Sequence, residues 1–191
     1  PTSSIRSLVS RPRILPMLLC WLSLTLSGSG CGTAHVESFA GTVPNLNLVQ
    51  YFEGNTRGYG QIYRFDKLSQ QFTVDVRGYW EGEVFVLDEH FTFVDGRTVE
   101  RQWRITKVDQ HRFEARADDV KGVANGVSFG KAIRWNYTMS MEKFSDSSWQ
   151  FTFDDWMFRQ TDDLLLNRAR IRKWGITFGE MIILFERLGS G

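Results

Sequence analysis

Cysteine and histidine are scarce in this chain of 191 residues, which contains two cysteines and three histidines. The histidines, His35, His90 and His111, are too scattered along the sequence to predict a metal site. The sequence also lacks the His-Glu-x-x-His motif of zinc proteases, the Gly-x-Ser-x-Gly motif of serine hydrolases and a phosphate-binding glycine motif. We therefore expect neither a metal nor a cofactor.

Long apolar runs are missing as well. The apolar run from Ile14 to Leu26 covers 13 residues and is interrupted by Pro16, Ser23 and Thr25. A helix that spans a membrane needs about 20 apolar residues, so this run is too short. It lies instead between three arginines and the small residues 27–30, which is the three-part layout of a secretory signal.

Cys31 directly follows these small residues, so the segment resembles the signal of a bacterial lipoprotein. In such proteins the cysteine is acylated and becomes the first residue of the mature chain. Cys20 fits less well, because Leu19 precedes it where processing requires a small residue. Gly28 stands where these signals usually carry Leu, so secretion without a lipid is the alternative. Gly32 replaces the Asp that favours the inner membrane, and the resemblance therefore implies the periplasmic face of the bacterial outer membrane.

Removal of residues 1–30 changes both the charge and the thiol content. It takes away three basic residues and leaves 20 basic against 22 acidic residues, a net charge of −2. This balance argues against nucleic-acid binding, which needs a concentrated basic surface. Because Cys20 leaves with the signal and Cys31 carries the lipid, we expect no disulfide, no cysteine-based zinc site and no thiol nucleophile.

The rest of the chain is dominated by alternation of apolar and polar residues, which is typical of strands with one buried face. The clearest case, Ile133–Met141, predicts that Trp135 and Tyr137 face the interior, whereas Arg134 and Asn136 face the other way. Turn residues separate nine strand candidates, near residues 58–66, 70–79, 83–94, 98–108, 111–117, 127–142, 148–159, 163–174 and 176–188. Long sequential strands without amphipathic helices between them predict an all-β fold, an antiparallel up-and-down barrel of about nine strands.

Three further segments complete this organisation. Residues 31–45 are small and polar and are predicted to be a tether between the lipid and a barrel domain of residues 46–191. Leu46–Phe52 is either a short helical turn or an opening strand. The evenly spaced Gly122, Gly126 and Gly130 are interpreted as a flexible loop.

Several motifs together resemble a family of bacterial lipoproteins known as domain of unknown function 3833. The most specific are Asp154-Asp155-Trp156-Met157 and the Asp-Val-x-Gly-x-Ala-x-Gly segment of residues 119–126, and the resemblance extends from about Leu46 to Leu188. It implies a lipocalin-like barrel, and the proximity of some members' genes to those of fatty-acid-modifying enzymes favours a lipid ligand. The family implies no catalytic chemistry. Lys131 departs from the Asn that the family pattern has after Gly130.

Aromatic residues make up 14% of the chain and are the main candidates for ligand contact. Each of them can equally serve to fill the core of a small barrel. If the barrel keeps an open lumen, Trp103 and Trp135 are the first candidates to line it, because both lie in the middle of alternating runs. The full set of candidate ligand-binding residues is Trp103, Trp135, Tyr137, Phe151, Phe153, Asp155 and Trp156.

Two pairs of adjacent carboxylates, Asp118-Asp119 and Asp154-Asp155, raise the question of acid–base catalysis. Adjacent strand residues point to opposite faces, so the pair Asp154-Asp155, which lies in a predicted strand, does not form a catalytic dyad by adjacency alone. A structural salt bridge, with Arg134 or Arg104 as partner of the second pair, or a turn cap is the preferred interpretation.

Three functions follow from these observations. The leading one is a lipoprotein of the outer membrane that binds a fatty acyl chain or another apolar small molecule. An enzyme of lipid modification that uses Asp155 or Asp118 is the first alternative. A structural accessory factor that binds a protein partner through an exposed sheet edge is the second.

The lipoprotein interpretation predicts the behaviour of one variant. Since Cys31 alone follows a small-residue stretch, Cys31→Ser should abolish acylation and release the protein from membranes. Cell fractionation and the mass of the mature protein measure both effects. A variant that is processed normally and stays in the membrane fraction would contradict the prediction.

Overall fold

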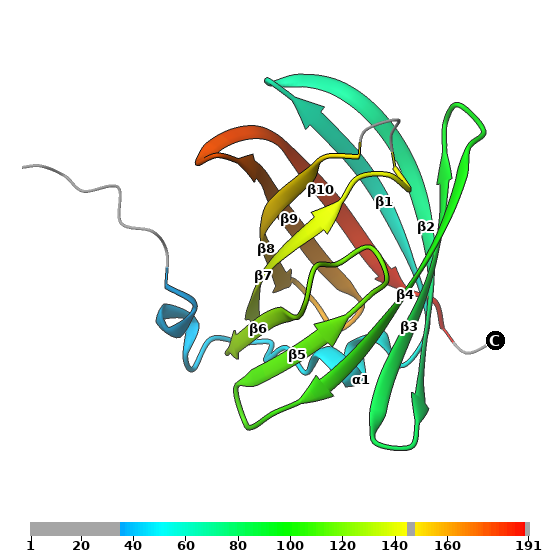
Figure 1. The fold of residues 1–191 in the computed structure, drawn as a ribbon. Helices are drawn as coiled ribbons and strands as arrows, with labels where there is room; N and C mark the ends of the chain where they lie inside the picture. Colours follow the sequence, from blue (N-terminus) through cyan, green and yellow to red (C-terminus); the bar gives the residue numbers. More distant parts are fainter. Residues whose placement is uncertain (1–34, 145–147, 190–191) are drawn as a thin grey trace, which may run out of the picture. The chain divides into compact units, whose positions relative to one another are not determined.

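A computed structural model describes residues 35–144 and 148–189, in which ten strands close into one barrel (Figure 1). The predicted signal peptide and Cys31 lie outside the described residues. A short 3-10 helix, η1 (Val36–Phe39), and an α-helix, α1 (Leu48–Phe52), precede the strands. The strands are β1 (Gly54–Arg64), β2 (Lys67–Glu81), β3 (Val84–Phe93), β4 (Thr98–Lys107), β5 (Arg112–Arg116), β6 (Ala124–Phe129), β7 (Ala132–Ser140), β8 (Gln150–Arg159), β9 (Leu164–Lys173) and β10 (Ile176–Arg187).

Each strand pairs in antiparallel fashion with its neighbours in sequence, and β1 also pairs with β10. This last pairing closes the sheet, so the predicted all-β up-and-down barrel is confirmed. Neither helix of the described residues is long and apolar enough to cross a membrane.

The barrel has ten strands, one more than the sequence predicts. The candidate near 127–142 divides at Gly130 into β6 and β7, whose ends pair at Phe129 and Ala132. Gly130 adopts φ +51° in this turn, a conformation that glycine reaches without steric cost. The interpretation of Gly126 and Gly130 as part of a flexible loop is therefore wrong. Gly126 belongs to β6, and a Cβ there would lie 2.7 Å from the ring of Trp135.

The alternating pattern decides which side chains enter the barrel. Trp135 and Tyr137 are 5% and 7% exposed and face the interior, whereas Asn136 is exposed, as the sequence predicts. The other strands follow the same rule, since Phe72, Val74 and Val76 on β2 are buried within the same core. Closure places the apolar face of every strand in a single interior.

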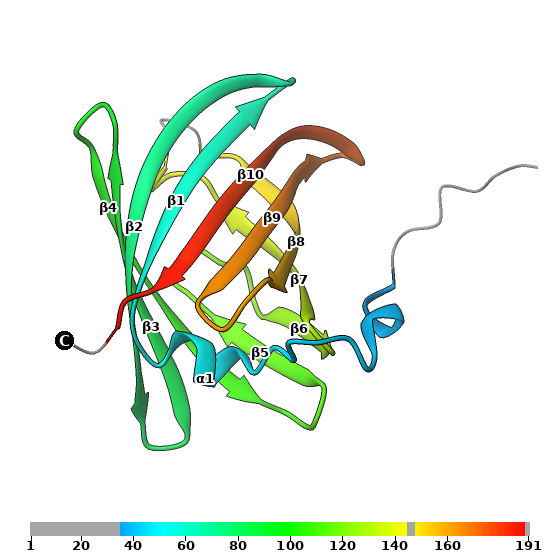
Figure 2. The same cartoon turned by 180° about the vertical axis from the view of Figure 1, so that it is seen from behind.

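Helix α1 covers one end of the barrel, at its lower end in Figure 2. The side chain of Asn47 accepts a hydrogen bond from the backbone N–H of Gln50 and caps the first turn. Leu48, Tyr51 and Phe52 are buried, and the Tyr51 hydroxyl donates to the carbonyls of Asp163 and Phe185 at 2.9 and 3.0 Å. A helix of five residues is unstable alone, so these contacts hold it in place.

Part of the predicted tether also contacts the barrel. Helix η1 packs against β6 and β7, and the ring of Phe39 lies 6.1 Å from that of Trp156 and 5.4 Å from that of Phe158. Trp156 and Phe158 lie on the outer face of β8, and the segment that contains η1 shields their rings from water.

The contact between α1 and β2 generates a test of the fold. A Cβ added at Gly78 would lie 2.0 Å from the carbonyl oxygen of Phe52, so Gly78→Ala must displace the helix. We expect the free energy of unfolding to fall by about 1–3 kcal/mol in denaturant titrations. Gly189→Ala, where no atom lies within 4 Å of the added Cβ, is the control. Equal stability of the two variants would show that α1 does not press on Gly78.

Candidate functional site

A cavity of about 60 Å³ lies inside the barrel. Its wall is mostly apolar, and part of it comes from Leu48 and Phe52 of α1. The volume has room for about two water molecules and not for an acyl chain. Among the described residues, side chains therefore fill most of the interior, and this cavity is smaller than the open lumen considered from the sequence.

Five polar side chains interrupt the apolar wall of this cavity. They are Glu89, Arg101, Tyr137, Asp155 and Asn167. All lie on the inward face of their strands, and Asn167 is only 1% exposed. A barrel that needed only a filled core would place apolar residues at these positions, because burying polar groups costs free energy.

Asp155 is the centre of the first polar group. One carboxylate oxygen accepts a hydrogen bond from the Tyr137 hydroxyl at 3.2 Å, and the other accepts one from the amide of Asn167. Asn167 also donates to the backbone carbonyl of Trp156 at 3.1 Å. Burial raises the pKa of Asp155 to about 6, although the hydrogen bonds from Asn167 and Tyr137 oppose this shift. Asp155 can thus exchange a proton near neutral pH.

Arg101 is the centre of the second polar group. Its Nε donates to Glu89 at 2.7 Å, and its guanidinium carbon lies 5.0 Å from the ring centre of Trp103. Burial alone would lower the pKa of Arg101, but the carboxylates of Glu89 and Asp119 outweigh it, and the pKa is raised. Arg101 therefore stays charged inside the barrel.

Asp119 is the least satisfied member of this second group. Its nearest cation is Arg101, 3.8 Å away, and neither carboxylate oxygen has a hydrogen-bond partner among the described residues. Burial raises the pKa of Asp119, in opposition to the attraction of Arg101 and Lys143.

The structure separates the candidate ligand-binding residues into two sets. Trp103, Trp135, Tyr137 and Asp155 line the cavity. Phe153 is buried behind them, where its ring stacks on Tyr137 at a centroid distance of 5.0 Å.

The other two candidates, Phe151 and Trp156, lie away from the cavity. Phe151 contacts Trp149 and Phe178 nearer the end of the barrel. Trp156 lies on the outer face of β8, where its indole N–H donates to Asp154 at 3.1 Å.

Sequence reasoning missed Glu89, Arg101 and Asn167 as site residues. The alternation of the sequence could have identified them. Each of the three residues has apolar residues two positions before and after it, so each lies on the buried face of its strand. Arg101 lies between Val99 and Trp103 on the inward face of β4. A charged residue in phase with a buried face identifies a desolvated group.

The other acidic candidates form salt bridges on the outside of the barrel. Asp118 is bound by both oxygens to Lys143 Nζ, at 2.8 and 2.6 Å, and this contact lowers its pKa. Asp154 accepts from Arg134 Nε at 2.6 Å, so Arg134 is the partner, whereas Arg104 pairs with Glu81. Asp118 is thus a poor acid or base, and Asp155 is the better candidate of the two proposed.

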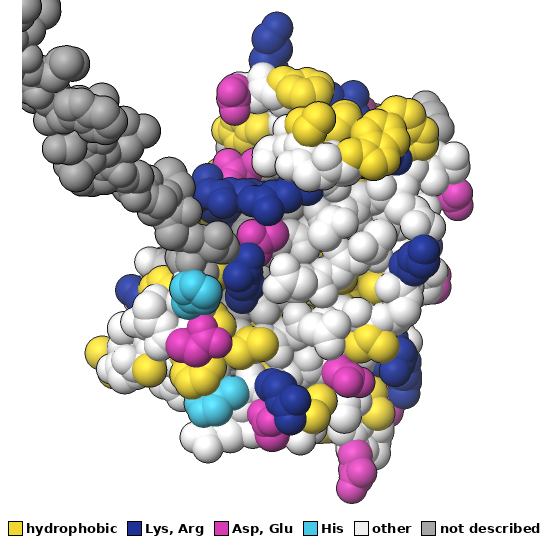
Figure 3. Space-filling view, turned by 60° about the vertical axis from the view of Figure 1, so that its left-hand side comes forward, with side chains coloured by type: hydrophobic (Ala, Val, Ile, Leu, Met, Phe, Trp, Pro, Cys, Tyr) yellow, Lys and Arg dark blue, Asp and Glu magenta, His cyan; other side chains and the backbone are white. Residues whose placement is uncertain are grey.

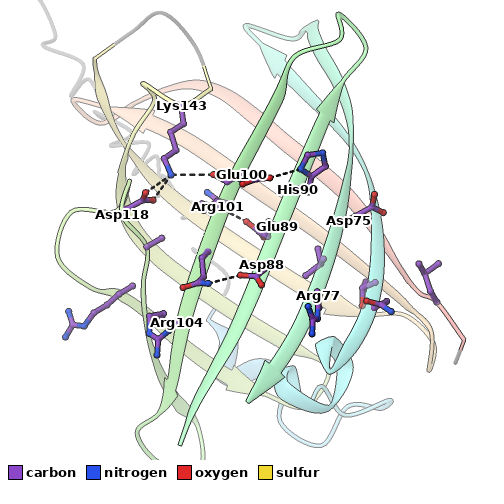
Figure 4. Close-up of a pocket in the computed structure, with 17 residues that line it drawn as sticks. Asp75, Arg77, Asp88, Glu89, His90, Glu100, Arg101, Arg104, Asp118 and Lys143 are labelled. Carbon is purple, nitrogen blue, oxygen red and sulfur yellow. Dashed lines mark hydrogen bonds and ion pairs between the residues drawn. The ribbon is translucent and has the colours of Figure 1, made fainter. Parts of the chain in front are cut away.

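A larger hollow of about 1020 Å³ lies on the outer face of β2, β3, β4 and β5 (Figure 4). Figure 4 shows Lys143 turned toward Asp118 and His90 turned toward Glu100, with 3.5 Å between the latter two side chains. Lys143 and Asp118 form an ion pair at the surface, and His90 and Glu100 are exposed, which is typical of a solvated surface. We therefore favour the interior as the functional site. Within the described ranges, no group of three or more His, Cys, Asp or Glu is placed to hold a metal ion.

Comparison with known proteins agrees with the barrel fold. A family model described as "Protein of unknown function (DUF3833)" matches residues 25–187. Among solved structures, the S-type phycobiliprotein lyase CPES from Guillardia theta has a TM-score of 0.54 at 9% sequence identity, over 75% of this chain and 92% of that chain. At this identity the match shows a shared fold, the lipocalin-like barrel. No curated protein matches the chain.

The raised pKa of Asp155 predicts a pH dependence of stability. Between pH about 4 and 6 the folded protein holds a proton on Asp155 that the unfolded chain has lost, so stability from this group falls as pH rises. Relative to Asp155→Asn, the wild type should lose on the order of 3 kcal/mol of unfolding free energy from pH 4 to pH 7. Urea titrations of both proteins at several pH values measure the difference. Parallel curves over this range would contradict the prediction.

Proposed function

We propose that this chain, which belongs to the family described as Protein of unknown function (DUF3833), binds an apolar small molecule with a neutral polar end inside its barrel. The observation that carries this proposal is the pair of buried polar groups around Asp155 and Arg101 at a cavity whose wall is otherwise apolar. Ligand sites commonly combine an apolar wall, which supplies affinity, with a few polar groups that orient the ligand.

The charges around the cavity favour a ligand end that donates a hydrogen bond. Asp155 can accept from a hydroxyl or amide group, and Glu89 adds a second carboxylate to the wall. Arg101 already faces Glu89 and Asp119. A carboxylate ligand would therefore meet the carboxylates of Asp155 and Glu89, and the charge of Arg101 is already balanced by its acidic neighbours. A fatty alcohol therefore fits better than a fatty acid.

The ligand must displace side chains in order to fit. Met157 and Met181 line the cavity, and methionine changes rotamer easily and adapts to different partners. Leu48 and Phe52 belong to the short helix α1, whose shift would open the interior at that end. Each CH₂ group buried by the ligand would contribute about 0.8 kcal/mol.

The site of action in this proposal follows from the N-terminal sequence. Acylation of Cys31 would hold the barrel at the periplasmic face of the outer membrane, close to a source of apolar ligands. Fractionation of Cys31→Ser, described above, tests this part separately from ligand binding.

The enzyme alternative keeps one specific observation in its favour. Asp155 combines a pKa of about 6 with a position at the cavity, as expected of a general acid or base. The solved structure with a similar fold is named a lyase, which is compatible with chemistry in such a barrel. The accessory-factor alternative has less support, since the described strands are ordered in a closed barrel, and only the part of β4 before Arg104 lacks a strand partner on the β5 side.

Titration with 1-dodecanol and with dodecanoate at pH 8 tests the proposed function. Because Trp103 and Trp135 line the cavity, binding should change tryptophan emission in a saturable way. We expect dodecanoate to bind roughly tenfold more weakly than the alcohol, a difference of ~1.4 kcal/mol. Met181→Ala enlarges the cavity and should increase affinity for the alcohol.

Two matched variants identify the polar contact. Asp155→Asn removes the charge at the cavity and should reduce the preference for alcohol over acid. Asp154→Asn makes the same chemical change on the outer face of β8 and should leave the preference unchanged. Absence of a saturable response in both the wild type and Met181→Ala would refute ligand binding. Equal affinity for acid and alcohol in the wild type would refute the assignment of the polar end.

A further inference from the structure

The end of the barrel opposite α1 carries a cluster of exposed apolar side chains, here called the tip cluster. Its members come from the β1–β2 turn and the start of β2, the segment before β8, and the β9–β10 turn and the start of β10; they are Phe65, Leu68, Trp149, Trp174 and Ile176. Trp174 is 78% exposed, Phe65 62% and Ile176 60%. Both turns lie at the upper end of the barrel in Figure 1, whereas α1 lies at the lower end.

Ring contacts join these separate segments into one surface. Phe65 lies 5.7 Å from Phe178, which lies 5.6 Å from Phe151 on β8. Trp149 lies 6.4 Å from Phe151 and 5.9 Å from Trp174. These contacts connect the three aromatic members of the tip cluster, Phe65, Trp149 and Trp174, which come from segments that are distant in sequence.

The backbone conformation of the two turns disfavours the aromatic residues Phe65 and Trp174, so the stability of the fold does not account for their presence. Phe65 and Trp174 have φ values of +46° and +50° and occupy the first central position of two-residue hairpin turns. Asn is preferred at that position, and a bulky side chain with positive φ is a steric outlier. Because their rings are mostly exposed, burial does little to offset the strain.

Basic residues surround the tip cluster. Lys173 Nζ lies 4.0 Å from the ring centre of Trp149 and 4.9 Å from that of Trp174. Arg64 and Lys67 flank the Phe65 turn, and Asp66 is the only acidic residue in the two turns. Figure 3 shows hydrophobic side chains gathered at this end of the molecule, with a group of Lys and Arg beneath them.

Two of the arginines next to this end are available for a partner. Arg170 and Arg172 lie on the outer face of β9 and form no ion pair among the residues that the structure describes. Arg168, on the same face, pairs with Glu180. The surroundings of the tip cluster thus carry an excess of positive charge.

We propose that the tip cluster docks the barrel on an anionic lipid bilayer, with the aromatic rings at the level of the headgroups and the Lys and Arg side chains on lipid phosphates. Exposed Trp and Phe flanked by cations are the side chains that favour a membrane interface. Two protruding turns can enter a lipid surface without a complementary groove. This inference goes beyond the proposed function and does not depend on a ligand in the barrel.

Flotation of the Cys31→Ser chain, which cannot carry the predicted lipid, with lipid vesicles tests the docking. Binding should be stronger to vesicles that contain phosphatidylglycerol than to pure phosphatidylcholine, and salt should weaken it. The double variant Phe65→Asn with Trp174→Asn should bind phosphatidylglycerol vesicles about tenfold less tightly or weaker still. Its melting temperature should stay equal or rise, because Asn suits both turn positions.

A matched control and a second readout locate the contact. Trp80→Asn removes a ring that is 49% exposed on β2, away from both turns, and should leave vesicle binding unchanged. Vesicles with brominated acyl chains quench nearby tryptophans, and Trp174→Phe should reduce this quenching if Trp174 enters the lipid.

Each result of the vesicle experiments either supports or overturns the proposed docking surface. Loss of binding in the double variant but not in Trp80→Asn, together with quenching of Trp174, supports the docking surface. Vesicle binding that the double variant retains would place the lipid contact elsewhere in the chain and overturn the inference. Absence of vesicle binding would also overturn it and would favour a protein partner. If the double variant does not fold, quenching of Trp174 in the folded wild type decides the question.

Discussion

The pairing of β1 with β10 is the constraint on which the rest of the structure depends. It joins the first strand to the last and turns ten half-buried strands into one enclosed interior. Burial then follows largely from alternation, since alternate residues along the middle of each strand enter the barrel interior. Helix α1 is held at one end by this closure, because its tyrosine bonds to the carbonyls of Asp163 and Phe185.

Closure also gives the interior polar groups their properties. Asp155 and Arg101 would be ordinary charged residues on an open sheet, but inside the barrel they are desolvated. Burial raises the pKa of Asp155, and two carboxylates keep Arg101 charged. The same closure limits the space beside them to about 60 Å³, so ligand binding requires movement of the wall.

The two ends of the barrel differ in how well the residues present suit the local backbone conformation. At the α1 end, sequence preference and structure agree, with Asn47 as helix cap and Gly78 beneath the helix. At the other end, Phe65 and Trp174 occupy turn positions that suit asparagine. Local conflicts of this kind commonly mark functional surfaces, because selection for function tolerates a cost in stability.

The sequence by itself determined the strands, the class of fold and the facing of residues such as Trp135 and Arg134, because alternation is a local property of the chain. It did not separate β6 from β7, since the turn at Gly130 is sharper than its neighbours indicate. It also included Trp156 among the candidate ligand-binding residues, although alternation puts Trp156 on the face of β8 opposite Phe151 and Phe153. Only the tertiary structure decided which residues meet across the barrel, such as Asp155 with Tyr137 and Asn167, or Arg101 with Glu89 and Asp119. These contacts depend on strand register and on closure, which local periodicity does not specify.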